Sequence, residues 1–317
     1  MSHEYSKVLV SGGAGFIGSH IVDQLIKERM EVIVLDNLER GYLENIKLHM
    51  CGGNLTFVRG DVRDYRLVEE LVEDVDAIIH LAALTSVPES FKDPFMYNDV
   101  NVVGTLNFLK ASLNSDVRRF IYASSCAVYG NPKKLPIKES HSLHPKSPYG
   151  IGKIAAEYYL RLYFEMFGVK TVCLRYFNVY GPRQVCNQYS GVIIQFLNCL
   201  RENRSLVIFG DGEQTRDFVH VQDVVKATML GLARSNAAGE VFNVGTGEAT
   251  TINHVAKTLL EIFGNRDSKV VHSKSREGDI RHSVADISKA KKVLLYAPEV
   301  TWQEGLKNVA RSHCSMI

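Results

Sequence analysis

At 317 residues, the chain is long enough for one large α/β domain or for two smaller ones. Apolar residues make up 45% of the sequence, charged residues 23%, and the formal net charge is +2, so nothing in the composition indicates a nucleic-acid or membrane partner. No apolar run reaches the roughly 20 residues that a membrane-spanning helix needs, and the polar start of the chain shows no signal peptide, so we expect a cytoplasmic protein.

The spacing of the cysteines and histidines argues against a disulfide scaffold and against a metal site. The six cysteines include no Cys-x-x-Cys pair, and the eleven histidines include no His-x-x-x-His pair. In a chain of this length, such cysteines are expected to be reduced and mostly buried. We therefore predict no bound metal.

Short apolar runs alternate with helical patterns over the first 176 residues. Strands are predicted at 7–11, 31–35, 55–59, 77–81, 119–124 and 171–176. Helices are predicted at 19–29, 66–72, 94–114 and 148–167. This alternation is typical of an α/β protein with a doubly wound parallel sheet.

The regular alternation weakens after Asn178, where turns at 181–182, 210–212 and 245–247 separate shorter elements. We predict a first domain over 1–177, joined by a returning segment near 216–247. The rest of 178–317 is predicted to form mainly a smaller, substrate-binding lobe. The strand-like stretch 240–244 is expected to pair with the first sheet.

Gly12, Gly15 and Gly18 stand between the first predicted strand and the first predicted helix. A dinucleotide-binding turn needs a sharp bend, a close approach of backbone N–H groups to a pyrophosphate, and tight packing of the helix on the sheet. Each is easiest for a residue without Cβ. The Gly-x-x-Gly-x-x-Gly spacing differs from the commoner Gly-x-Gly-x-x-Gly motif, so a glycine-rich turn without a ligand stays an alternative.

Acidic residues follow the next two predicted strands. Asp36 comes directly after the second strand, where a carboxylate would accept hydrogen bonds from adenosine ribose hydroxyls. It would also repel a 2′-phosphate, which favours NAD over NADP, although the nearby Arg40 weakens that preference. Asp61 and Val62 follow the third strand and are placed to meet the adenine. A turn-forming aspartate is the alternative interpretation of Asp61.

Tyr149 and Lys153 lie four residues apart in the predicted helix 148–167, so their side chains share one face. The charge of Lys153 is expected to favour the ionised form of Tyr149 and so to lower a pKa that is ordinarily about 10. A phenol with a lowered pKa can act as a general base on an alcohol. An exposed helix face is the alternative explanation of this pair taken alone.

Five motifs occur along the chain in a characteristic order. They are Gly12–Gly18 (GGAGFIG), His80–Ala83 (HLAA), Ser124-Ser125, Tyr149-x-x-x-Lys153 and the stretch 175–183 (RYFNVYGPR). Together, over essentially the whole chain, they resemble the extended short-chain dehydrogenases/reductases, and among these the nucleotide-sugar 4-epimerases. The resemblance implies a Rossmann-type NAD domain, a small C-terminal nucleotide-sugar lobe and a homodimer built on a four-helix bundle.

The resemblance also implies roles for individual residues. Tyr149 is the general base, Lys153 holds the nicotinamide ribose and lowers the Tyr149 pKa, and a serine assists at the sugar 4-hydroxyl. Counting back from the VYG stretch at 128–130 assigns that serine to Ser125, with Ser124 as the alternative. Tyr149 removes the O4 proton while C4 gives hydride to NAD⁺; the 4-ketose then turns over and takes the hydride back on its other face. The remaining residues expected around NAD are Phe16, Ile17, Asn37, Leu81, Ala82, Ala83, Asn101 and Tyr176.

Cys126 and Ala127 follow the predicted catalytic serine. Related 4,6-dehydratases carry an Asp-Glu pair there, and decarboxylating relatives carry a Glu nearby, so the absence of an acid favours simple epimerisation. Cys126 itself is either a reactive thiol or a buried side chain outside the chemistry. Two alternatives remain: another nucleotide-sugar modifier (a uronate epimerase, decarboxylase or dehydratase), and a non-catalytic dinucleotide-sensing protein on the same fold.

The resemblance extends to the substrate. Asn178, Arg216 and Arg276 are expected to contact the diphosphate of a UDP-sugar, because guanidinium forks suit phosphate oxygens. Asp279 is expected to accept the uridine ribose hydroxyls. Ser86 is expected to face the hexose, with a loop-capping serine as the alternative.

Ser283 stands where the family places a residue that limits the room for the sugar C2 substituent. A bulky Tyr there restricts the pocket to glucose and galactose, whereas a small residue admits an N-acetyl group. We therefore expect UDP-GlcNAc and UDP-GalNAc to be accepted, together with UDP-Glc and UDP-Gal.

The predicted helix 148–167 carries large apolar residues around much of its circumference, more than one buried stripe requires. They are Tyr158, Tyr159, Leu162, Tyr163, Phe164 and Phe167. Burial in the core of the subunit explains some of them, and the homodimer implied by the resemblance explains the others.

Overall fold

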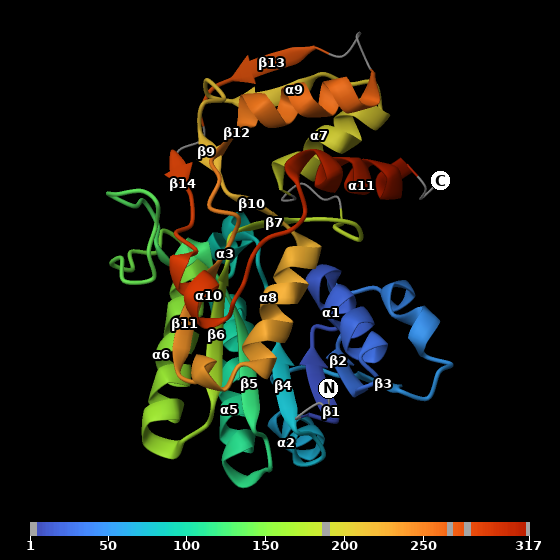
Figure 1. Cartoon of the computed structure of the whole chain (residues 1–317), viewed down its shortest axis with the longest axis vertical. Helices are drawn as coiled ribbons and strands as arrows, with labels where there is room; N and C mark the ends of the chain where they lie inside the picture. The colour runs from blue at the N-terminus through green and yellow to red at the C-terminus, as the bar shows by residue number, and fades with distance from the viewer. Residues whose placement is uncertain (1–4, 186–190, 265–268, 276–279, 315–317) are drawn as a thin grey trace.

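A computed structural model describes residues 5–185, 191–264, 269–275 and 280–314. Its centre is a seven-stranded sheet in the order β11-β6-β5-β4-β1-β2-β3, with every neighbouring pair parallel (Figure 1). The strands are β1 (Lys7–Ser11), β2 (Glu31–Asp36), β3 (Leu55–Arg59), β4 (Ala77–His80), β5 (Arg119–Ser125), β6 (Thr171–Tyr176) and β11 (Glu240–Val244). The predicted doubly wound parallel sheet of Rossmann type is confirmed.

Helices cover both faces of this sheet, which explains why its strands are almost continuously apolar. In β1, Val8 and Val10 point into one core and Leu9 into the other. The first core is completed by α1 (Phe16–Lys27) and α8 (Val221–Ala233), and the second by α2 (Tyr65–Glu73), α5 (Gly104–Ala111) and α6 (Pro148–Phe167). The alternation of side chains along each strand therefore divides the apolar residues between two cores.

The predicted helix 94–114 is helical throughout but not uniform. It runs through α4 (Pro94–Asn98), a π-helical stretch η3 (Asp99–Val103), α5 and a 3₁₀ turn η4 (Ser112–Asn114). The π-helical stretch contains the buried Asn101, whose side chain bonds to a neighbouring loop. A π-bulge inside a helix commonly re-aims side chains of this kind.

The bounds of α6 agree with the sequence prediction because both of its ends carry recognisable signals. The Ser147 hydroxyl accepts a hydrogen bond from the Gly150 N–H at 3.1 Å, and Pro148 occupies the first turn. Gly168 ends the helix in the left-handed conformation, with φ 74°. Tyr149 and Lys153 therefore lie in the first two turns of a well-delimited helix.

Residues after β6 build a second group of elements above the carboxyl ends of the strands (Figure 1). Its short strands pair as β7 (Asn178–Tyr180) with β10 (Phe218–His220), β8 (Leu206–Phe209) with β13 (Val270–Ser273), and β9 (Thr215–Arg216) with both β12 (Thr250–Thr251) and β14 (His282–Ser283). Its helices are α7 (Val192–Arg201), α9 (Ile252–Phe263) and α11 (Trp302–Cys314), which enclose a third hydrophobic core.

The remaining elements are short connections. They are η1 (Leu43–Asn45), η2 (Lys47–His49), α3 (Val87–Lys92), η5 (Cys126–Val128), η6 (Ser235–Ala237) and α10 (Ser288–Val293). Among the residues described, no helix is long and apolar enough to cross a membrane.

The expectation of only shorter elements after Asn178 is wrong for four described helices of ten or more residues, α7, α8, α9 and α11. For α9 the signal was present in the sequence, since Ile252, Val255, Ala256 and Leu259 follow helical spacing and are all buried. Thr251 also caps its start by accepting a hydrogen bond from the His254 N–H at 3.1 Å. By contrast, the stretch 240–244 does form a strand, β11, at the edge of the central sheet beside β6.

Candidate active site

The glycine-rich turn connects β1 to α1 and requires glycine at two positions. Gly12 adopts φ +73°, and a Cβ there would lie 2.8 Å from the Ala82 backbone nitrogen. A Cβ on Gly18 would lie 2.1 Å from the Gly12 carbonyl oxygen. The turn therefore packs directly against α1 and against the loop after β4, and it leaves the first N–H groups of α1 facing the space beyond the sheet.

A cavity of about 670 Å³ opens at the carboxyl ends of the strands; we call it the large cavity. Such a crevice beside the strands where the order of a doubly wound sheet reverses is the usual ligand site of the fold. The predicted cofactor residues that line it are Gly12, Gly15, Phe16, Ile17, Gly18, Asp36, Asn37, Asp61, Val62, Leu81, Ala82, Ala83, Tyr149, Lys153 and Tyr176. The structure thus brings together residues from the ends of five strands and from α6.

Asn101 is the one predicted cofactor residue that does not line the large cavity. Its amide is buried and bonds to the backbone of Leu84, accepting from the N–H and donating to the carbonyl, both at 2.9 Å. Asn101 therefore fixes the loop that follows β4, a loop whose residues 81–86 do line the cavity.

Asp36 is held firmly at the end of β2. Its carboxylate accepts hydrogen bonds from the Ala14 N–H at 3.0 Å and the Leu38 N–H at 2.9 Å, while burial raises its pKa. Arg40, which weakened the sequence-based preference for NAD, forms an ion pair with Glu89 at 2.8 Å. The charge of Arg40 is therefore partly neutralised within the protein itself.

Asp61 makes a local ion pair. Its carboxylate accepts from the Arg63 guanidinium at 2.8 Å through two nitrogens, and this contact lowers the Asp61 pKa to about 2. The Asn37 amide also donates to Asp61, at 3.3 Å. The turn-forming interpretation of Asp61 and its place in the cavity wall are thus both compatible with the structure.

Tyr149, Lys153 and Ser125 meet in the wall of the large cavity. Tyr149 and Lys153 come from α6, and Ser125 is the last residue of β5. The Ser125 hydroxyl lies beside the Tyr149 phenol and lowers its pKa. Lys153 donates from Nζ to the Ala123 carbonyl at 2.7 Å and lies 4.7 Å from the centre of the Tyr122 ring. A hydroxyl, a phenol and an ammonium group are therefore gathered in one place.

The predicted lowering of the Tyr149 pKa is wrong for this structure. Burial raises the pKa of Tyr149 to about 12 and outweighs the opposing hydrogen bond from Ser125. Lys153 Nζ is directed at a backbone carbonyl and lies 6.0 Å from the Tyr149 ring centre. Burial also lowers the pKa of Lys153 to about 7, so its charge is only partly present near neutral pH. Sequence spacing placed the two groups on one face but could not show how strongly both are desolvated.

The structure separates the roles of the two adjacent serines. Ser125 accepts a hydrogen bond from the Ala127 N–H at 3.2 Å and contacts Tyr149. Ser124 is buried and donates instead to Glu157 at 2.5 Å. Ser125 is therefore the serine that lies beside the phenol, and its catalytic role stays a prediction.

Ser86 both lines the large cavity and caps a helix. Its hydroxyl accepts from the Glu89 N–H at 3.3 Å at the start of α3. The two sequence-based interpretations of Ser86 therefore do not exclude each other.

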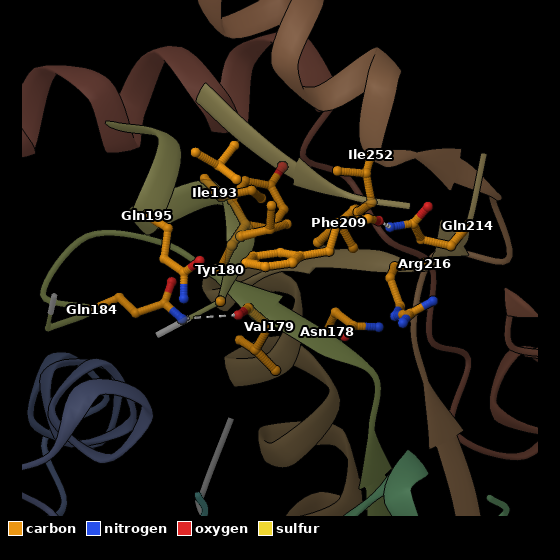
Figure 2. A pocket seen from close by; sticks show the side chains of 14 residues that line it. Asn178, Val179, Tyr180, Gln184, Ile193, Gln195, Phe209, Gln214, Arg216 and Ile252 are labelled. Carbon is orange, nitrogen blue, oxygen red and sulfur yellow. Dashed lines mark hydrogen bonds between the residues drawn. The ribbon is translucent and has the colours of Figure 1, made fainter. Parts of the chain in front are cut away.

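A second space of about 240 Å³, the small cavity, adjoins the large one, and the two share Val179, Gln184 and Gly191 in their walls. Asn178 and Arg216, both predicted to contact substrate, line it from β7 and β9. Figure 2 shows these two side chains on one side of the cavity and Gln184 and Gln195 on the other. The Arg216 guanidinium donates to the Thr215 carbonyl at 2.9 Å.

Sequence reasoning missed most of the wall of the small cavity. The unpredicted members include the aromatic ring of Phe209 and the amides of Gln184, Gln195 and Gln214 (Figure 2). A flat ring combined with amide donors and acceptors suits a planar heteroaromatic base. These residues stand in no recognisable motif, so only their convergence in space identifies them.

Of the three remaining predicted substrate residues, only Ser283 is described, and it lines neither cavity. Arg276 and Asp279 lie outside the described residues. Ser283 is buried at 6% exposure on β14 and pairs with Arg216 on β9. Its hydroxyl lies beside the Cys126 thiol and lowers the pKa of that thiol, so Ser283 is a neighbour of the residue that follows Ser125.

Cys126 is a neutral thiol at physiological pH. Burial raises the pKa of Cys126 to about 11. The charge of Arg216 and the hydroxyls of Ser283 and Ser125 lower that pKa, but by less than burial raises it. Of its two sequence-based interpretations, this environment matches the unreactive one, because a thiol needs a low pKa to be a nucleophile.

Comparison with protein families decides the class of the protein. A family model described as GDP-mannose 4,6 dehydratase matches residues 9–309. The chain belongs to this family. Members of the GDP-mannose 4,6 dehydratase family are extended short-chain dehydrogenases/reductases, so the predicted resemblance is confirmed.

Relatives of known name lie within the same superfamily of nucleotide-sugar epimerases and dehydratases. A putative UDP-glucose 4-epimerase of Methanocaldococcus jannaschii is 42% identical over 95% of this chain and 96% of its own. The solved UDP-N-acetylglucosamine 4-epimerase of Methanobrevibacter ruminantium, in complex with UDP-N-acetylmuramic acid, is 37% identical with a TM-score of 0.94, over 99% of this chain and 100% of that one.

Two further solved structures represent the two reaction types found among the relatives, epimerisation and dehydration. The UDP-glucose 4-epimerase of Thermotoga maritima, with UDP-glucose, is 39% identical with a TM-score of 0.92, over 98% of this chain and 99% of that one. DesIV, a dTDP-glucose 4,6-dehydratase of Streptomyces venezuelae with NAD bound, is 32% identical with a TM-score of 0.89, over 98% and 97%. Both epimerases and dehydratases therefore share this fold.

Proposed function

We propose that this protein is an NAD-dependent 4-epimerase of UDP-hexoses. It would interconvert UDP-GlcNAc with UDP-GalNAc, and UDP-Glc with UDP-Gal, through a transient 4-keto sugar. The observation that carries this proposal is the meeting of Ser125, Tyr149 and Lys153 in the wall of a dinucleotide-sized cavity, next to a second cavity suited to a nucleotide.

The large cavity fits NAD. A Cβ at Gly12 or Gly18 would collide with backbone, so the turn leaves room for a pyrophosphate against the first N–H groups of α1. The Asp36 carboxylate is oriented by the Ala14 and Leu38 N–H groups, and its remaining lone pairs can accept ribose hydroxyls. When bound, NAD supplies a reversible acceptor for the hydride of the sugar C4–H bond.

Tyr149 and Ser125 act on the oxygen of the sugar hydroxyl. With a pKa raised to about 12 by burial, the Tyr149 phenol is protonated at neutral pH and suited to return a proton to a ketone oxygen. In the opposite half of the reaction the phenolate must be stabilised, which the Ser125 hydrogen bond and the charge of Lys153 would do. Tyr149 is 8% exposed, so bulk water has little access to the reacting oxygen.

The distribution of carboxylates supports epimerisation rather than dehydration. Among the described residues that line the two cavities, the carboxylates are Asp36, the last residue of β2, Glu39, which follows β2, and Asp61, which follows β3. Beside Ser125 stand Cys126, a neutral thiol, and Ala127. Because neither Cys126 nor Ala127 can act as an acid or base, the loss of water from the sugar lacks a proton donor beside Ser125. The 4-keto sugar can then only take the hydride back, which is epimerisation.

The small cavity supports a UDP-sugar as substrate. Arg216 and Asn178 offer donors to a diphosphate, and Phe209 with the neighbouring glutamine amides offers a face and hydrogen bonds to a base. Because the cavities meet at Val179, Gln184 and Gly191, the sugar between base and cofactor would reach Tyr149. The small Ser283 side chain beside Cys126 supports acceptance of N-acetylated sugars.

The test is to incubate the purified protein separately with UDP-GlcNAc, UDP-Glc and UDP-glucuronic acid and to analyse each mixture by chromatography and mass spectrometry. We expect a new species of unchanged mass from the first two. A product lighter by one water would identify a dehydratase, and one lighter by CO₂ a decarboxylase. No conversion of any of them would favour the dinucleotide-sensing alternative.

We further propose that the protein is a homodimer that associates through α4 and α6. Exposed apolar side chains gather on these two packed helices: Phe95 at 82%, Ile151 at 58%, Tyr158 at 61%, Leu162 at 47%, Met166 at 68% and Phe167 at 59%. Contiguous apolar surface of this kind usually marks an interface. Sedimentation should show a dimer that Leu162→Lys weakens, whereas Leu48→Lys, on η2 at 89% exposure, leaves it intact. A monomeric wild-type protein would contradict the proposal.

A further inference from the structure

A buried ion pair, Glu157–Arg175, lies beside the residues of α6 that are proposed to be catalytic. Glu157 follows Lys153 by one turn of α6 and Tyr149 by two, so the three side chains share one face. Glu157 pairs with Arg175 on β6, and the two side chains are 6% and 4% exposed. Neither residue lines the large or the small cavity. A buried ion pair is expensive to desolvate, so its presence calls for an explanation.

The Glu157 carboxylate is fully engaged by two strands of the sheet. It accepts from Arg175 Nε at 2.9 Å and from Arg175 Nη2 at 2.6 Å, one bond to each oxygen. The oxygen that accepts from Nε also accepts from the Ser124 hydroxyl on β5, at 2.5 Å. Glu157 therefore ties α6 to β5 and β6 and fixes the rotamer of Ser124, which lines the large cavity.

Arg175 extends the network away from the cavity. Its Nη1 donates to the Tyr129 hydroxyl at 2.8 Å and to the Glu139 carbonyl at 3.2 Å, and Tyr129 donates to the Asn243 amide oxygen at 2.6 Å. Burial lowers the pKa of Arg175, but the hydrogen bonds and charge of Glu157 outweigh it and leave that pKa above its ordinary value. Arg175 therefore stays charged, and its guanidinium holds the Glu157 carboxylate by two charge-assisted hydrogen bonds.

Lys153 and Glu157 reach adjacent residues of the same strand. Lys153 Nζ donates to the Ala123 carbonyl, and Glu157 accepts from the Ser124 hydroxyl. Burial is the main influence on the Lys153 pKa and lowers it, whereas the negative charge of Glu157 opposes that lowering. Loss of the Glu157 charge would therefore deprotonate Lys153 at a lower pH.

We propose that Glu157 is a positioning residue of the active site, which acts on Tyr149 chemistry through Lys153 and Ser124 without touching the substrate. Its carboxylate favours the charged form of the buried Lys153 and holds the Ser124 side chain in the cavity wall. Arg175 anchors the carboxylate in that place. This role rests on the proposed function, because it concerns the groups that would carry the reaction.

A purely structural ion pair is the competing explanation, and the titration of Lys153 separates the two. The ionisable groups around Lys153 come from α6 and from the three strands beneath it. They are Glu157 and Tyr149 on α6, Tyr122 on β5, Cys173 on β6 and His80 on β4. Burial lowers the pKa of His80 to about 3 and raises the pKa of Tyr149, Tyr122 and Cys173, which disfavours the charged form of all four. Glu157 is the carboxylate of this group, and its charge opposes the lowering of the Lys153 pKa.

The experiment is an NMR titration of protein labelled with ¹³C at the lysine Cε, with the Lys153 signal assigned by its loss in Lys153→Arg. In the wild type we expect a midpoint near pH 7. In E157Q/R175M, which removes both charges together and leaves no unpaired ion, the midpoint should fall by about one pH unit or more. E165Q is the matched control, because Glu165 lies on the same helix but pairs with Arg161 at the exposed surface. An unchanged midpoint in E157Q/R175M overturns the proposal.

A second variant keeps the test decisive if the neutral pair does not fold. E157D retains a carboxylate for Arg175, but its shorter side chain draws that carboxylate back from β5, where Lys153 Nζ also lies. We therefore expect the Lys153 midpoint to fall, but by less than in E157Q/R175M. A midpoint equal to that of the wild type in a folded E157D would equally overturn the proposal. A structural role alone would lower the melting temperature of either variant and leave the Lys153 titration in place.

Activity gives an independent readout. With a UDP-hexose that the wild type converts, the alkaline limb of the kcat/KM profile should move to lower pH in E157Q/R175M and stay in E165Q. If the wild type converts no UDP-sugar, the proposed function fails, whereas the NMR titration still decides the role of Glu157.

Discussion

The large and the small cavity differ in how the chain builds them. Much of the wall of the large cavity comes from short stretches that directly follow strands of the central sheet, within 12–18, 35–42, 60–62 and 81–86. The small cavity takes its wall from many single side chains, spread from Asn178 to Ile252 and carried in part by strands of two to four residues. The first is shaped by local backbone geometry, and the second by non-local pairing of short strands.

This difference has a physical consequence for each cavity. A turn such as 12–18 is defined by the conformations that its own residues allow, once the sheet has placed its two ends. Arg216 instead owes its place to the pairing of β9 with β12 and with β14. Both of these strands lie more than thirty residues after Arg216 in the sequence. We therefore expect substitutions around the large cavity to affect cofactor and catalysis, and those around the small cavity to affect substrate affinity and selectivity.

The largest effect is expected for Tyr149→Phe. Removing the phenol oxygen abolishes proton transfer, and we expect turnover to fall by about 10²- to 10⁴-fold while NAD affinity and melting temperature stay near wild type. Epimer formation from UDP-GlcNAc measures this. Tyr65→Phe is the control and should retain full activity, because Tyr65 lies on α2 and lines neither cavity. Unimpaired turnover in Tyr149→Phe would refute the proposed chemistry.

Gly18→Ala tests whether backbone geometry shapes the large cavity. The new Cβ would lie 2.1 Å from the Gly12 carbonyl oxygen, so the turn must shift. We expect a loss of about 1–3 kcal/mol in the free energy of unfolding and at least a tenfold weaker affinity for NAD, measured by denaturation and calorimetry.

The matched control for Gly18→Ala is Gly231→Ala in α8. A Cβ there would meet its nearest neighbour, a side-chain carbon of Ile121, at an ordinary 3.6 Å, so stability and NAD affinity should be kept. Equal NAD affinity in both variants would show that the turn does not shape the cofactor site.

Arg216→Ala tests the small cavity. Loss of a charge-assisted contact to a diphosphate should weaken UDP-sugar binding by about 10- to 100-fold and leave NAD binding unchanged. Arg281→Ala serves as its control, because Arg281 pairs with Asp211 on the exposed surface at 2.6 Å and lines neither cavity. If calorimetry finds the same UDP-sugar affinity in both variants, Arg216 does not bind the substrate.

Ser283→Tyr should have the smallest and most selective effect. A bulky side chain beside Cys126 should reduce turnover of the N-acetylated pair relative to the plain hexoses by about tenfold or more. The measurement is kcat/KM for UDP-GlcNAc and UDP-Glc in parallel, with the melting temperature as a check on folding. An equal loss on both substrates would show that Ser283 does not set the selectivity.

Sequence reasoning was most successful where a function depends on consecutive residues. It found the strands of the first 176 residues, the glycine turn, Asp36 and the helix that carries Tyr149 and Lys153. It failed for Phe209 and the glutamines of the small cavity, because a single aromatic or amide side chain has no distinctive sequence pattern. It also missed α7 and α8, whose apolar residues stood between glycine-rich turns and were not recognised as helical.

The sequence by itself determined which groups stand at the proposed active site: Ser125, Tyr149 and Lys153, with Cys126 and Ala127, neither of them an acid, directly after Ser125. The tertiary structure decided their state. Burial raises the pKa of Tyr149 and lowers that of Lys153, and the pair Glu157–Arg175 occupies Ser124 and leaves Ser125 beside the phenol. Spacing along a helix fixes which side chains are neighbours, but desolvation and charge depend on every element packed around them, and those elements come from distant parts of the chain.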